Sequence, residues 1–447
     1  MNQPPDSIIV REVLHDTSIW CARAPDAGLT ASGRPREVQA LVVGAGPGGS
    51  AAAWHLASRG VETLLVERSA FPREKVCGDG LTPRGVKQLQ EIGIDPAAEG
   101  FTRIDGLRVY RDDQPILLMP WPELRSYPNF GVVRTRHDFD EMLAEHAVAA
   151  GATLLQRTDA VEPIVEDGWV VGALLRDLED PDSEPFEVRA SVVIAADGAS
   201  SRFGSRAGVR RDPSRPMGIG ARRYYRTTRE VGPWMESWLE LREKGKMLPG
   251  YGWIFPVSEG VINVGAGLLN SFRNFSEVSA KGTFDTFVNM LPAEWELTEE
   301  NALGPILSGP IPMGMNRRPP ALPGLLLVGD AAGVVNPFNG EGIAHAMESG
   351  AMAAELAADS MASGRAGLAQ AYPAALQARY GSYYAAGRFF VRAIGNPEVM
   401  RLATQYGLPR EGLMKFLLRV MSGLSDGRDG DAQDKLIHAI RRLVPAA

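Results

Sequence analysis

The sequence has little cysteine and little histidine. Its 447 residues include two cysteines, Cys21 and Cys77, and six scattered histidines. Two cysteines exclude a disulfide framework and an all-cysteine metal site, and the histidines show no HExxH or paired zinc spacing. We therefore predict no metal site, and the low cysteine count suits a reducing cytoplasm.

Long apolar runs and excess positive charge are also missing. The most apolar stretch, residues 40–54, contains several glycines and is shorter than the roughly 20 residues of a membrane-spanning helix. Residues 1–37 carry scattered charges and lack the continuous apolar region of a secretory signal. With 47 basic and 54 acidic residues the net charge is −7, which gives no reason to expect a nucleic-acid partner. We expect a cytoplasmic protein.

What is present is enough apolar sequence for a large core. Hydrophobic residues make up 45% of the chain, and at this length we expect two or three lobes. Residues 1–37 are an N-terminal extension, either loosely docked or, through the β-rich residues 7–10, an added strand or lid.

A dinucleotide-type turn opens the main body of the chain. Residues 38–43 form a β-rich apolar run that leads into Gly44-Ala-Gly46-Pro-Gly-Gly49 and an alanine-rich helical segment. A second strand at 61–66 ends at Glu67, 67 − 49 = 18 residues beyond the last glycine. This spacing is typical of a carboxylate that bonds a ribose hydroxyl.

Each residue type in this turn has a physical purpose. Gly44 permits the tight turn, Gly46 lets the backbone approach a pyrophosphate, and Gly49 lets helix and strand pack closely. The helix N-terminus supplies N–H groups and a positive dipole end. We assign these glycines, with Glu67 and the adjacent Arg68, to cofactor binding.

Two further turns indicate FAD rather than NAD. Gly329-Asp330 follows an apolar strand, and Gly340-Glu-Gly342 precedes a long helical pattern. A carboxylate at a strand end can hold the ribityl chain of a flavin, and a helix N-terminus stabilises the reduced ring. Asp197-Gly198 ends another strand. Each pair alone is most simply a tight turn, but the three sites in this order favour a flavin nucleotide.

The three sites resemble those of the flavoprotein superfamily with the p-hydroxybenzoate-hydroxylase-like fold. The resemblance implies that the first motif binds the ADP half of FAD, that Asp330 holds its ribityl side, and that Asp197 lies near its pyrophosphate. It also implies that Arg136, at the start of a helix, contacts the cofactor. No separate nicotinamide domain is implied, so the reductant is left open between NAD(P)H and another donor, including an electron-donor protein.

Two motifs narrow the family. Cys77-Gly-Asp-Gly-Leu-Thr-Pro-Arg84 resembles a loop of geranylgeranyl reductase-type flavoproteins, which include the actinobacterial menaquinone reductases. Residues 249–256 match the P-x-Y-x-W-x-F-P pattern of that group at every fixed position. The resemblance extends from about Val38 to the end of the chain and leaves out residues 1–37.

The aromatic motif and the cysteine are the candidates for chemistry. In a strand, Tyr251, Trp253 and Phe255 share one face, which would form an aromatic wall for a hydrocarbon or planar ring. The alternative is that they fill the core of the second lobe, although the interleaved glycines favour close approach by a ligand. Cys77 is either a small buried apolar residue or, as the resemblance implies, a thiol that helps to protonate or position the substrate. We take Cys77, Tyr251 and Trp253 as catalytic candidates and the three aromatics as substrate-binding.

The expected fold is mixed α/β. A Rossmann-like FAD domain of the glutathione-reductase type comprises residues 38–105, 129–205 and 305–365. An antiparallel-sheet substrate lobe is inserted as residues 106–128 and 206–304, and residues 366–447 form a helical C-terminal region.

The expected activity is reduction of carbon–carbon double bonds in an isoprenoid chain, such as a geranylgeranyl group or a prenyl quinone. Two alternatives stay open: a flavin monooxygenase or halogenase of an aromatic or polyketide product, and a cyclase that keeps FAD as a scaffold. The halogenase-type W-x-W-x-x-I pattern is absent, because Phe255 stands two positions after Trp253. Helical apolar periodicity at 380–394 and 413–424, with interspersed arginines, leaves open a contact with a membrane surface.

Overall fold

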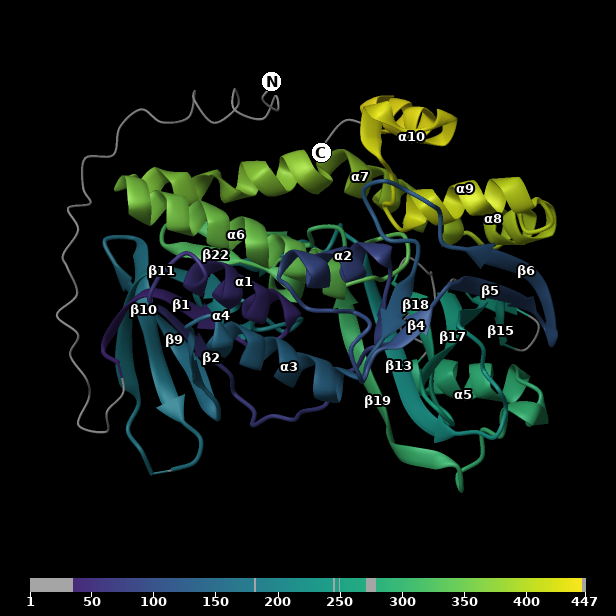
Figure 1. Ribbon diagram of the computed structural model, residues 1–447, viewed down its shortest axis with the longest axis horizontal. Helices are drawn as coiled ribbons and strands as arrows, with labels where there is room; N and C mark the ends of the chain where they lie inside the picture. The colour runs from purple at the N-terminus through teal and green to yellow at the C-terminus, as the bar shows by residue number, and fades with distance from the viewer. Residues whose placement is uncertain (1–34, 181, 244–245, 249, 271–278, 444–447) are drawn as a thin grey trace.

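The computed structural model describes residues 35–443, apart from 181, 244–245, 249 and 271–278. Two β-rich lobes lie side by side, and long helices cross the top of the molecule (Figure 1). The strand or lid suggested for residues 7–10 lies outside the described residues. The mixed α/β fold class is confirmed, with an inserted sheet lobe and a helical C-terminal region.

A mostly parallel sheet forms the first lobe. Its strand order is β21 (Ala321–Leu322), β22 (Leu325–Leu327), β11 (Phe186–Ala195), β1 (Glu37–Val43), β2 (Thr63–Val66) and β8 (Thr153–Leu155). An antiparallel hairpin of β9 (Thr158–Glu166) and β10 (Trp169–Asp177) extends from β11. In the centre, Leu41 pairs with Leu64 and Val193, and all three are fully buried. The central strands are continuous apolar runs, as expected of a sheet with both faces covered.

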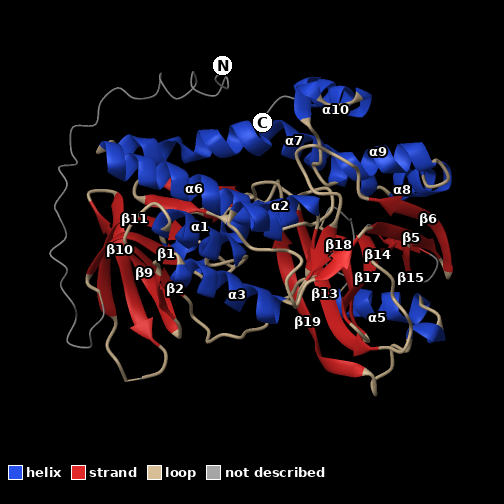
Figure 2. Ribbon diagram, viewed as in Figure 1, coloured by secondary structure: helices blue, strands red, loops and turns tan. Residues whose placement is uncertain are grey.

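Small residues allow the helices of this lobe to approach closely. Helix α1 (Pro47–Ala57) lies between the sheet and α6 (Ile343–Ser363), while α3 (Arg136–Ala149) covers another part of the lobe (Figure 2). A Cβ atom at Gly350 would lie 2.3 Å from the carbonyl oxygen of Gly48. The crossing of α1 and α6 therefore depends on glycine, and it fixes the N-terminal ends of both helices near the same cavity.

The second lobe is a seven-stranded sheet that is antiparallel except for the β14–β5 pair. Its order is β19 (Ala302–Pro312), β13 (Met217–Arg226), β18 (Val261–Leu269), β17 (Gly250–Ser258), β14 (Trp234–Trp238), β5 (Gly106–Arg111) and β6 (Gln114–Pro120). Helix α5 (Ala280–Met290) packs on one face. Because β19 runs to Pro312, this sheet includes residues that we assigned to the FAD domain, and the division into lobes remains our prediction.

Short strands complete the framework. A three-stranded sheet of β3 (Gly80–Leu81), β7 (Gly131–Val133) and β4 (Thr102–Ile104) lies between the two lobes. Two-stranded ladders join β12 (Arg210–Arg211) to β20 (Arg317–Arg318) and β15 (Leu241–Glu243) to β16 (Lys246–Leu248). Helix α4 (Arg202–Arg206) follows β11.

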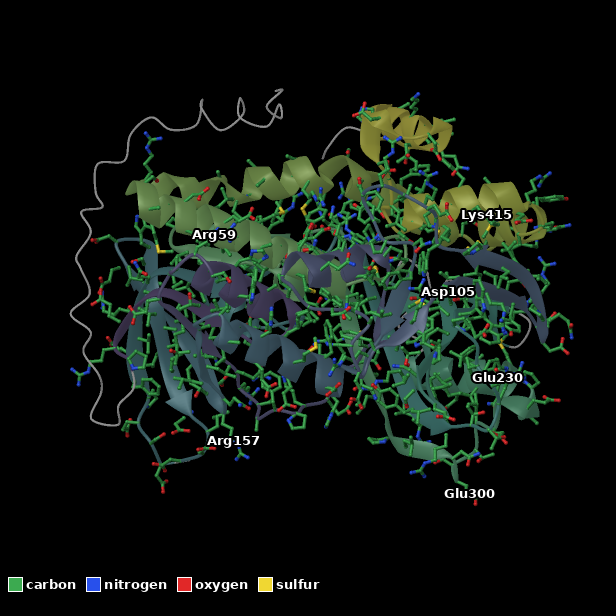
Figure 3. All side chains as sticks on the ribbon, in the orientation of Figure 1. Arg59, Asp105, Arg157, Glu230, Glu300 and Lys415 are labelled. Carbon is green, nitrogen blue, oxygen red and sulfur yellow. The ribbon has the colours of Figure 1, made fainter. Side chains whose placement is uncertain are left out.

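The C-terminal region is helical. Its main helices are α7 (Tyr372–Ile394), α8 (Pro397–Leu402), α9 (Glu411–Met421) and α10 (Ala432–Leu443), with a π-helical turn at Ala403–Gly407. Helix α9, which carries the labelled Lys415 (Figure 3), packs near β6 through Met414 and Leu418. Among the described residues, no helix is both long and apolar enough to cross a membrane.

A buried ion pair joins three helices. The carboxylate of Glu348 on α6 accepts two hydrogen bonds of 2.8 Å from Arg84 on α2 (Pro83–Glu91) and one of 2.7 Å from the Tyr380 hydroxyl on α7. Arg379 adds a further bond of 3.3 Å. The nearby arginines hold the pKa of Glu348 well below its usual range, although burial alone would raise it. This cluster fixes α2 and α7 on the helix that leads to the cavity.

Glu348→Gln should lower the free energy of unfolding by about 3 kcal/mol, because it leaves the buried Arg84 without its counter-charge. Since the folded pKa is depressed, the stabilisation is present above the ordinary carboxyl value of 4.5 and is lost as the pH falls below it. Urea unfolding at pH 7 and pH 4 measures both effects.

The matched control is Glu355→Gln on the same helix. Glu355 is 52% exposed and pairs with Arg59 at 3.2 Å, so its loss should cost less than about 1 kcal/mol. Equal effects of the two substitutions would contradict the assigned importance of the buried cluster.

Candidate active site

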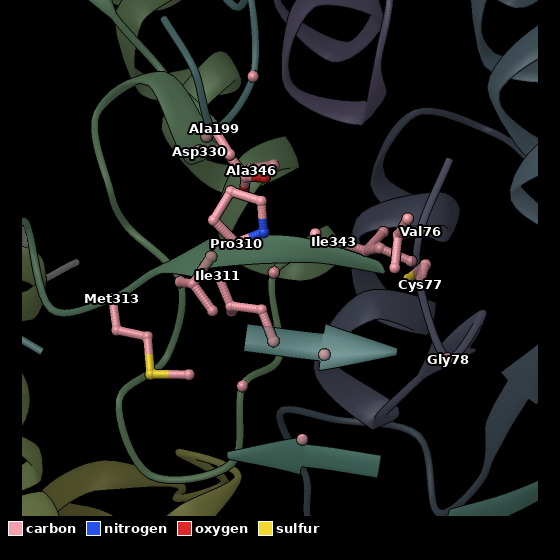
Figure 4. Close-up of a pocket in the computed structure, with 18 of the residues that line it drawn as sticks. Val76, Cys77, Gly78, Ala199, Pro310, Ile311, Met313, Asp330, Ile343 and Ala346 are labelled. Atoms are coloured by element: carbon pink, nitrogen blue, oxygen red, sulfur yellow. The ribbon is translucent and has the colours of Figure 1, made fainter. Parts of the chain in front are cut away.

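A cavity of about 860 Å³ lies between the two lobes. In Figure 4, Cys77 lies beside Ile343, and Ile311 and Met313 line the opposite side. The cavity brings together almost all of the predicted site residues: Gly44, Gly46, Glu67, Arg68, Cys77, Arg136, Asp197, Tyr251, Trp253, Phe255, Asp330, Gly340 and Gly342. Gly49 is the predicted residue that does not line it.

The glycine turn after β1 opens toward this cavity. Gly44 has a φ of +99°, and a Cβ atom there would lie 2.5 Å from the carbonyl oxygen of Ala196. At Gly49 a Cβ atom would lie 1.8 Å from the carbonyl oxygen of Gly44. Gly46 differs, since the nearest atom to its Cβ position is 3.8 Å away, on the Arg73 side chain. Gly44 and Gly49 therefore permit backbone packing, whereas Gly46 leaves an open cradle at the N-terminus of α1.

Glu67 lies at the carboxyl end of β2 beside an arginine. Its carboxylate accepts hydrogen bonds of 3.0 Å from the backbone N–H groups of Ala45 and Ser69. Arg73 pairs with Glu67 at 3.3 Å and with Asp140 at 3.0 Å. Arg68 points elsewhere: it is half exposed and lies 3.8 Å from Asp159. Of the two basic residues, Arg73 is therefore the one held against the carboxylates.

A second helix N-terminus meets the cavity near Asp330. Gly342 is the N-cap of α6 and supplies no side-chain cap. The Oδ1 atom of Asp330 lies 3.7 Å from the Cβ position of Gly342, and Gly340 has a φ of +77°. The first N–H groups of a 21-residue helix are thus available to an anionic or electron-rich edge.

Asp197 is engaged within its own turn. Its carboxylate accepts hydrogen bonds from the Ser201 hydroxyl at 3.1 Å and from the Phe203 backbone N–H at 2.8 Å. Burial raises the pKa of Asp197. The side chain therefore caps the start of α4, and it is Gly198, with a φ of +76°, that brings the backbone to the cavity wall.

The aromatic side chains of β17 line the cavity in sequence order. Ring centroids are 5.6 Å apart for Tyr251 and Trp253 and 6.2 Å apart for Trp253 and Phe255. Gly252 faces the opposite side, where a Cβ atom would lie 2.3 Å from the Phe287 ring of α5. The Tyr251 hydroxyl donates to the carbonyl oxygen of Asn339 at 2.9 Å, and burial raises its pKa to about 12. The phenol therefore stays protonated at neutral pH.

A buried aspartate connects the cysteine loop to the second lobe. Asp79 is 0% exposed and has a φ of +65°. Its carboxylate accepts hydrogen bonds from the Tyr224 hydroxyl at 2.5 Å, from the Asn263 amide at 2.8 Å and from the Arg136 backbone N–H at 3.2 Å. These bonds compensate the cost of burying the carboxyl group, whose pKa is raised by that burial.

Asn263 also links this aspartate and the cysteine loop to the aromatic wall. Its amide N–H₂ group also donates to the carbonyl oxygen of Cys77 at 2.9 Å, and its Oδ1 atom accepts from the Trp253 indole N–H at 3.0 Å. One amide therefore fixes the backbone of the cysteine and the ring of the tryptophan relative to each other.

The thiol of Cys77 is half-buried at the cavity wall. Burial raises its pKa, and the Arg136 guanidinium opposes that shift. Arg136 itself is held by Asp140 through hydrogen bonds of 2.5 and 2.7 Å. Because Asp140 neutralises the arginine, Cys77 is a protonated thiol at neutral pH and can serve as a proton donor.

Comparison with known proteins identifies the family. Residues 37–258 match the model of an FAD binding domain. The chain is 34% identical over 392 residues to a menaquinone reductase of Mycolicibacterium smegmatis, which covers 88% of this chain and 93% of that protein. It is also 34% identical over 330 residues to a digeranylgeranylglycerophospholipid reductase of Thermoplasma volcanium, covering 72% and 78% respectively. The chain belongs to the geranylgeranyl reductase family of flavoproteins.

Solved structures agree with this assignment. A geranylgeranyl bacteriochlorophyll reductase-like protein of Thermoplasma acidophilum superposes with a TM-score of 0.69 at 27% identity, covering 86% of this chain and 99% of that one. A flavin-dependent brominase superposes with a TM-score of 0.67 at 20% identity over 91% of this chain and 99% of its own. The second likeness, at that identity, shows the shared fold alone.

FAD is the cofactor of this geranylgeranyl reductase family member, and the cavity fits it. The open cradle at Gly46 suits a pyrophosphate, because a larger residue would occupy that space. Two helix N-termini, those of α1 and α6, meet the same cavity, so backbone N–H groups are available to an anionic or electron-rich group at two places in it.

Several residues that shape the site of this flavoprotein were not predicted. Arg73 lies in the polar stretch that leads into the cysteine loop, and Asp79 lies in that loop, but neither was among the predicted site residues. Arg222 and Tyr224 share a strand face, a pattern that the sequence does show. Arg222, only 2% exposed, pairs with Glu74, and its guanidinium lies 4.2 Å from the Tyr224 ring centroid. Only the fold shows that this face meets the cysteine loop.

Gly46→Val should weaken FAD binding at least about 100-fold, or 2.7 kcal/mol, because its side chain would fill the cradle at the start of α1. The apoprotein should unfold at the same temperature as wild type, since no atom lies within 3.8 Å of the new Cβ position. Fluorescence titration with FAD and thermal unfolding of the apoprotein measure the two effects. A valine variant that retains wild-type affinity would refute the cradle at Gly46.

Proposed function

We propose that this flavoprotein reduces carbon–carbon double bonds of an isoprenoid chain, carried by a prenyl quinone or a geranylgeranyl lipid. The observation that carries the proposal is the cavity itself, in which an aromatic wall and a protonated thiol face the FAD site. The names of the relatives, a menaquinone reductase and a digeranylgeranylglycerophospholipid reductase, support an isoprenoid substrate.

We propose that residues at the N-termini of α1 and α6 and at the end of β2 contact the cofactor. Gly44 and Gly46 with the start of α1 would hold the pyrophosphate, and Glu67, already held by the Ala45 N–H and Arg73, would hold the adenosine ribose. Asp330 and the N-terminus of α6 hold the ribityl chain and the flavin ring. When bound and reduced, FAD supplies the reducing equivalents.

The protein's own residues would orient the alkene and deliver the proton. An isolated alkene is a poor electrophile, so positioning and protonation carry most of the catalysis. Tyr251, Trp253 and Phe255 hold the chain flat against the cofactor and exclude water. The Cys77 thiol donates the proton at one alkene carbon, and the phenol of Tyr251, whose pKa is about 12, lines the same cavity.

The cavity continues toward the C-terminal helices, which suits a long apolar substrate. Its lining there is almost entirely apolar and comes from α7, α8, the π-helical turn and α9: Phe390, Ile394, Met400, Ala403, Gly407, Leu408, Leu413, Met414, Leu417 and Met421. On the same helices, Leu402, Tyr406 and the lining residue Leu413 are between 43% and 54% exposed. We propose that this apolar face touches a membrane surface, where a lipid-soluble substrate is collected.

The decisive experiment needs no knowledge of the electron donor, which we leave open between NAD(P)H and a donor protein. Purified enzyme, reduced chemically under strictly anaerobic conditions, should add two hydrogens per double bond to menaquinone or to a geranylgeranyl lipid, as measured by mass spectrometry. Failure with every polyprenyl substrate, together with substrate-stimulated oxygen consumption, would favour a monooxygenase instead.

Cys77→Ala should lower kcat by a factor of about 10² to 10⁴ with FAD binding unchanged, because the proton donor is lost. For wild type, the raised pKa of the thiol predicts a rate that is flat through neutral pH and falls only above pH 9.0, where the thiol loses its proton. Cys77→Ser should lose this alkaline limb, since a hydroxyl does not ionise in that range. An alkaline limb unchanged in either variant would rule out Cys77 as the acid.

A further inference from the structure

The loop before α6 carries an acidic side chain that the proposed chemistry does not use. Glu341 stands between Gly340 and Gly342, both of which line the active-site cavity, whereas Glu341 itself does not. Its Oε1 atom accepts a hydrogen bond of 2.6 Å from the Thr82 hydroxyl of the cysteine loop. Its Oε2 atom is buried and has no hydrogen-bond partner among the described residues. The backbone around Glu341 therefore borders the cofactor site, while its carboxyl group lies outside the cavity.

This carboxyl group belongs to a polar cluster where α6 packs on α2. Glu341, His345 and Glu348 are spaced i, i+4 and i+7, so they share one face of α6 and of the turn that leads into it. The titratable and charged groups around Glu341 come from five elements: Arg84 of α2, His345 and Glu348 of α6, Arg379 and Tyr380 of α7, Tyr251 of β17, and Asp330 beside Gly342.

Glu341 has to share its counter-charge. The cation that acts on it, Arg84, is already bound by Glu348 through two hydrogen bonds of 2.8 Å. His345 is 0% exposed, and burial lowers its pKa to about 3, so its ring is neutral. Neither of its ring nitrogens has a hydrogen-bond partner in the part of the chain that the structure describes. Burial therefore raises the pKa of Glu341 to about 7, although Thr82 and Arg84 act in the opposite direction.

A carboxyl group in this state responds to charge that appears nearby. Near neutral pH it is divided between its two protonation states, and a new negative charge favours the protonated one. The cofactor contacts proposed above place the flavin ring at the N-terminus of α6, beside Gly340 and Gly342. Reduction adds negative charge to the edge of the ring that this helix end faces. The charge on Glu341 and the redox state of the cofactor should therefore depend on each other.

We propose that Glu341 balances the charge of the flavin: its carboxylate binds one proton when bound FAD accepts two electrons, and releases that proton when FAD is reoxidised. With a two-electron reductant, FAD takes two electrons and one proton, and Oε2 of Glu341 takes a second proton from solvent. On reoxidation a hydride leaves FAD and the proton of Glu341 returns to solvent. Glu341 acts through its charge, so it is not a catalytic residue.

The inference rests on the cofactor contacts proposed above but requires no alkene, so its failure and the failure of alkene reduction are distinguishable. The test is the pH dependence of the midpoint potential of the full-length, FAD-loaded protein, reduced stepwise with dithionite under anaerobic conditions. Between about pH 7.5 and about pH 8.5, wild type should take up two protons per two electrons. Its reduction equilibrium should then shift about 100-fold per pH unit, or about 59 mV.

Glu341→Gln should take up only the proton that FAD itself binds. Its reduction equilibrium should shift about tenfold per pH unit, or about 30 mV, over the same range. FAD content and circular dichroism show that the variant is folded and loaded. The matched control, Glu355→Gln, removes an exposed carboxylate from the same helix and should keep the wild-type dependence.

A second variant changes the affinity of Glu341 for its proton without removing the carboxyl group. Thr82→Val deletes the hydroxyl that donates to Oε1, a bond that favours the charged form. The onset of the steep pH dependence should therefore move upward by about one pH unit. The same potential titration measures this shift.

A second measurement needs no FAD. In the apoprotein the raised pKa of Glu341 means that its contribution to stability is complete below the ordinary value of 4.5 and is lost as the pH rises through about 7. Glu341→Gln has no such loss. Relative to wild type, its folding equilibrium should therefore gain about 100-fold between about pH 4.5 and about pH 8, as measured by urea unfolding.

Three results would overturn the proposal. The first is a wild-type shift of only about tenfold per pH unit, which decides the matter even if the glutamine variant loses FAD. The second is an equal pH dependence of the potential in wild type and Glu341→Gln, which would place the second proton on another group. The third is an equal pH dependence of stability in the two apoproteins, which would mean that Glu341 is ionised throughout.

Discussion

The buried carboxylate of Asp79 is the interaction on which the site depends. It lies in the loop that carries Cys77, and it accepts hydrogen bonds from Tyr224 on β13, from Asn263 on β18 and from the backbone at the start of α3. These partners come from both lobes. A buried carboxylate that lacked them would cost several kcal/mol, so the lobes and the loop have one favourable arrangement.

This arrangement explains how the proposed proton donor and the proposed substrate-binding wall come to line the same cavity. Asn263 joins the carbonyl of Cys77 to the indole of Trp253, so the proposed acid and the proposed substrate wall keep a fixed separation. On the other side, α1 and α6 are held together by a glycine crossing, and α6 is tied to α2 and α7 by Glu348. Rigid elements therefore surround the space that FAD and substrate would occupy, as a preorganised site requires.

Helix α7 connects the core of the protein with the apolar end of the active-site cavity. Its C-terminal half lines the apolar end of the active-site cavity through Phe390 and Ile394. Its N-terminal half is anchored in the core by Tyr372, Tyr380 and Tyr384, all almost fully buried. In the membrane contact proposed above, a helix fixed at one end and exposed at the other, through Phe389, would couple the position of the protein on a bilayer to the entrance of its cavity.

The sequence by itself determined the dinucleotide turn, the FAD cofactor, the family and the alternation that puts Tyr251, Trp253 and Phe255 on one face. These follow from short-range geometry: the period of a strand, and the glycines and carboxylate that a nucleotide-binding turn requires. Arg73, Asp79, Asn263 and Arg222 could not be predicted in the same way. Their partners lie up to 186 residues away, as between Asn263 and Cys77. Only the tertiary structure decided which charges are buried together, because that depends on how the sheets and helices pack and not on any spacing along the chain.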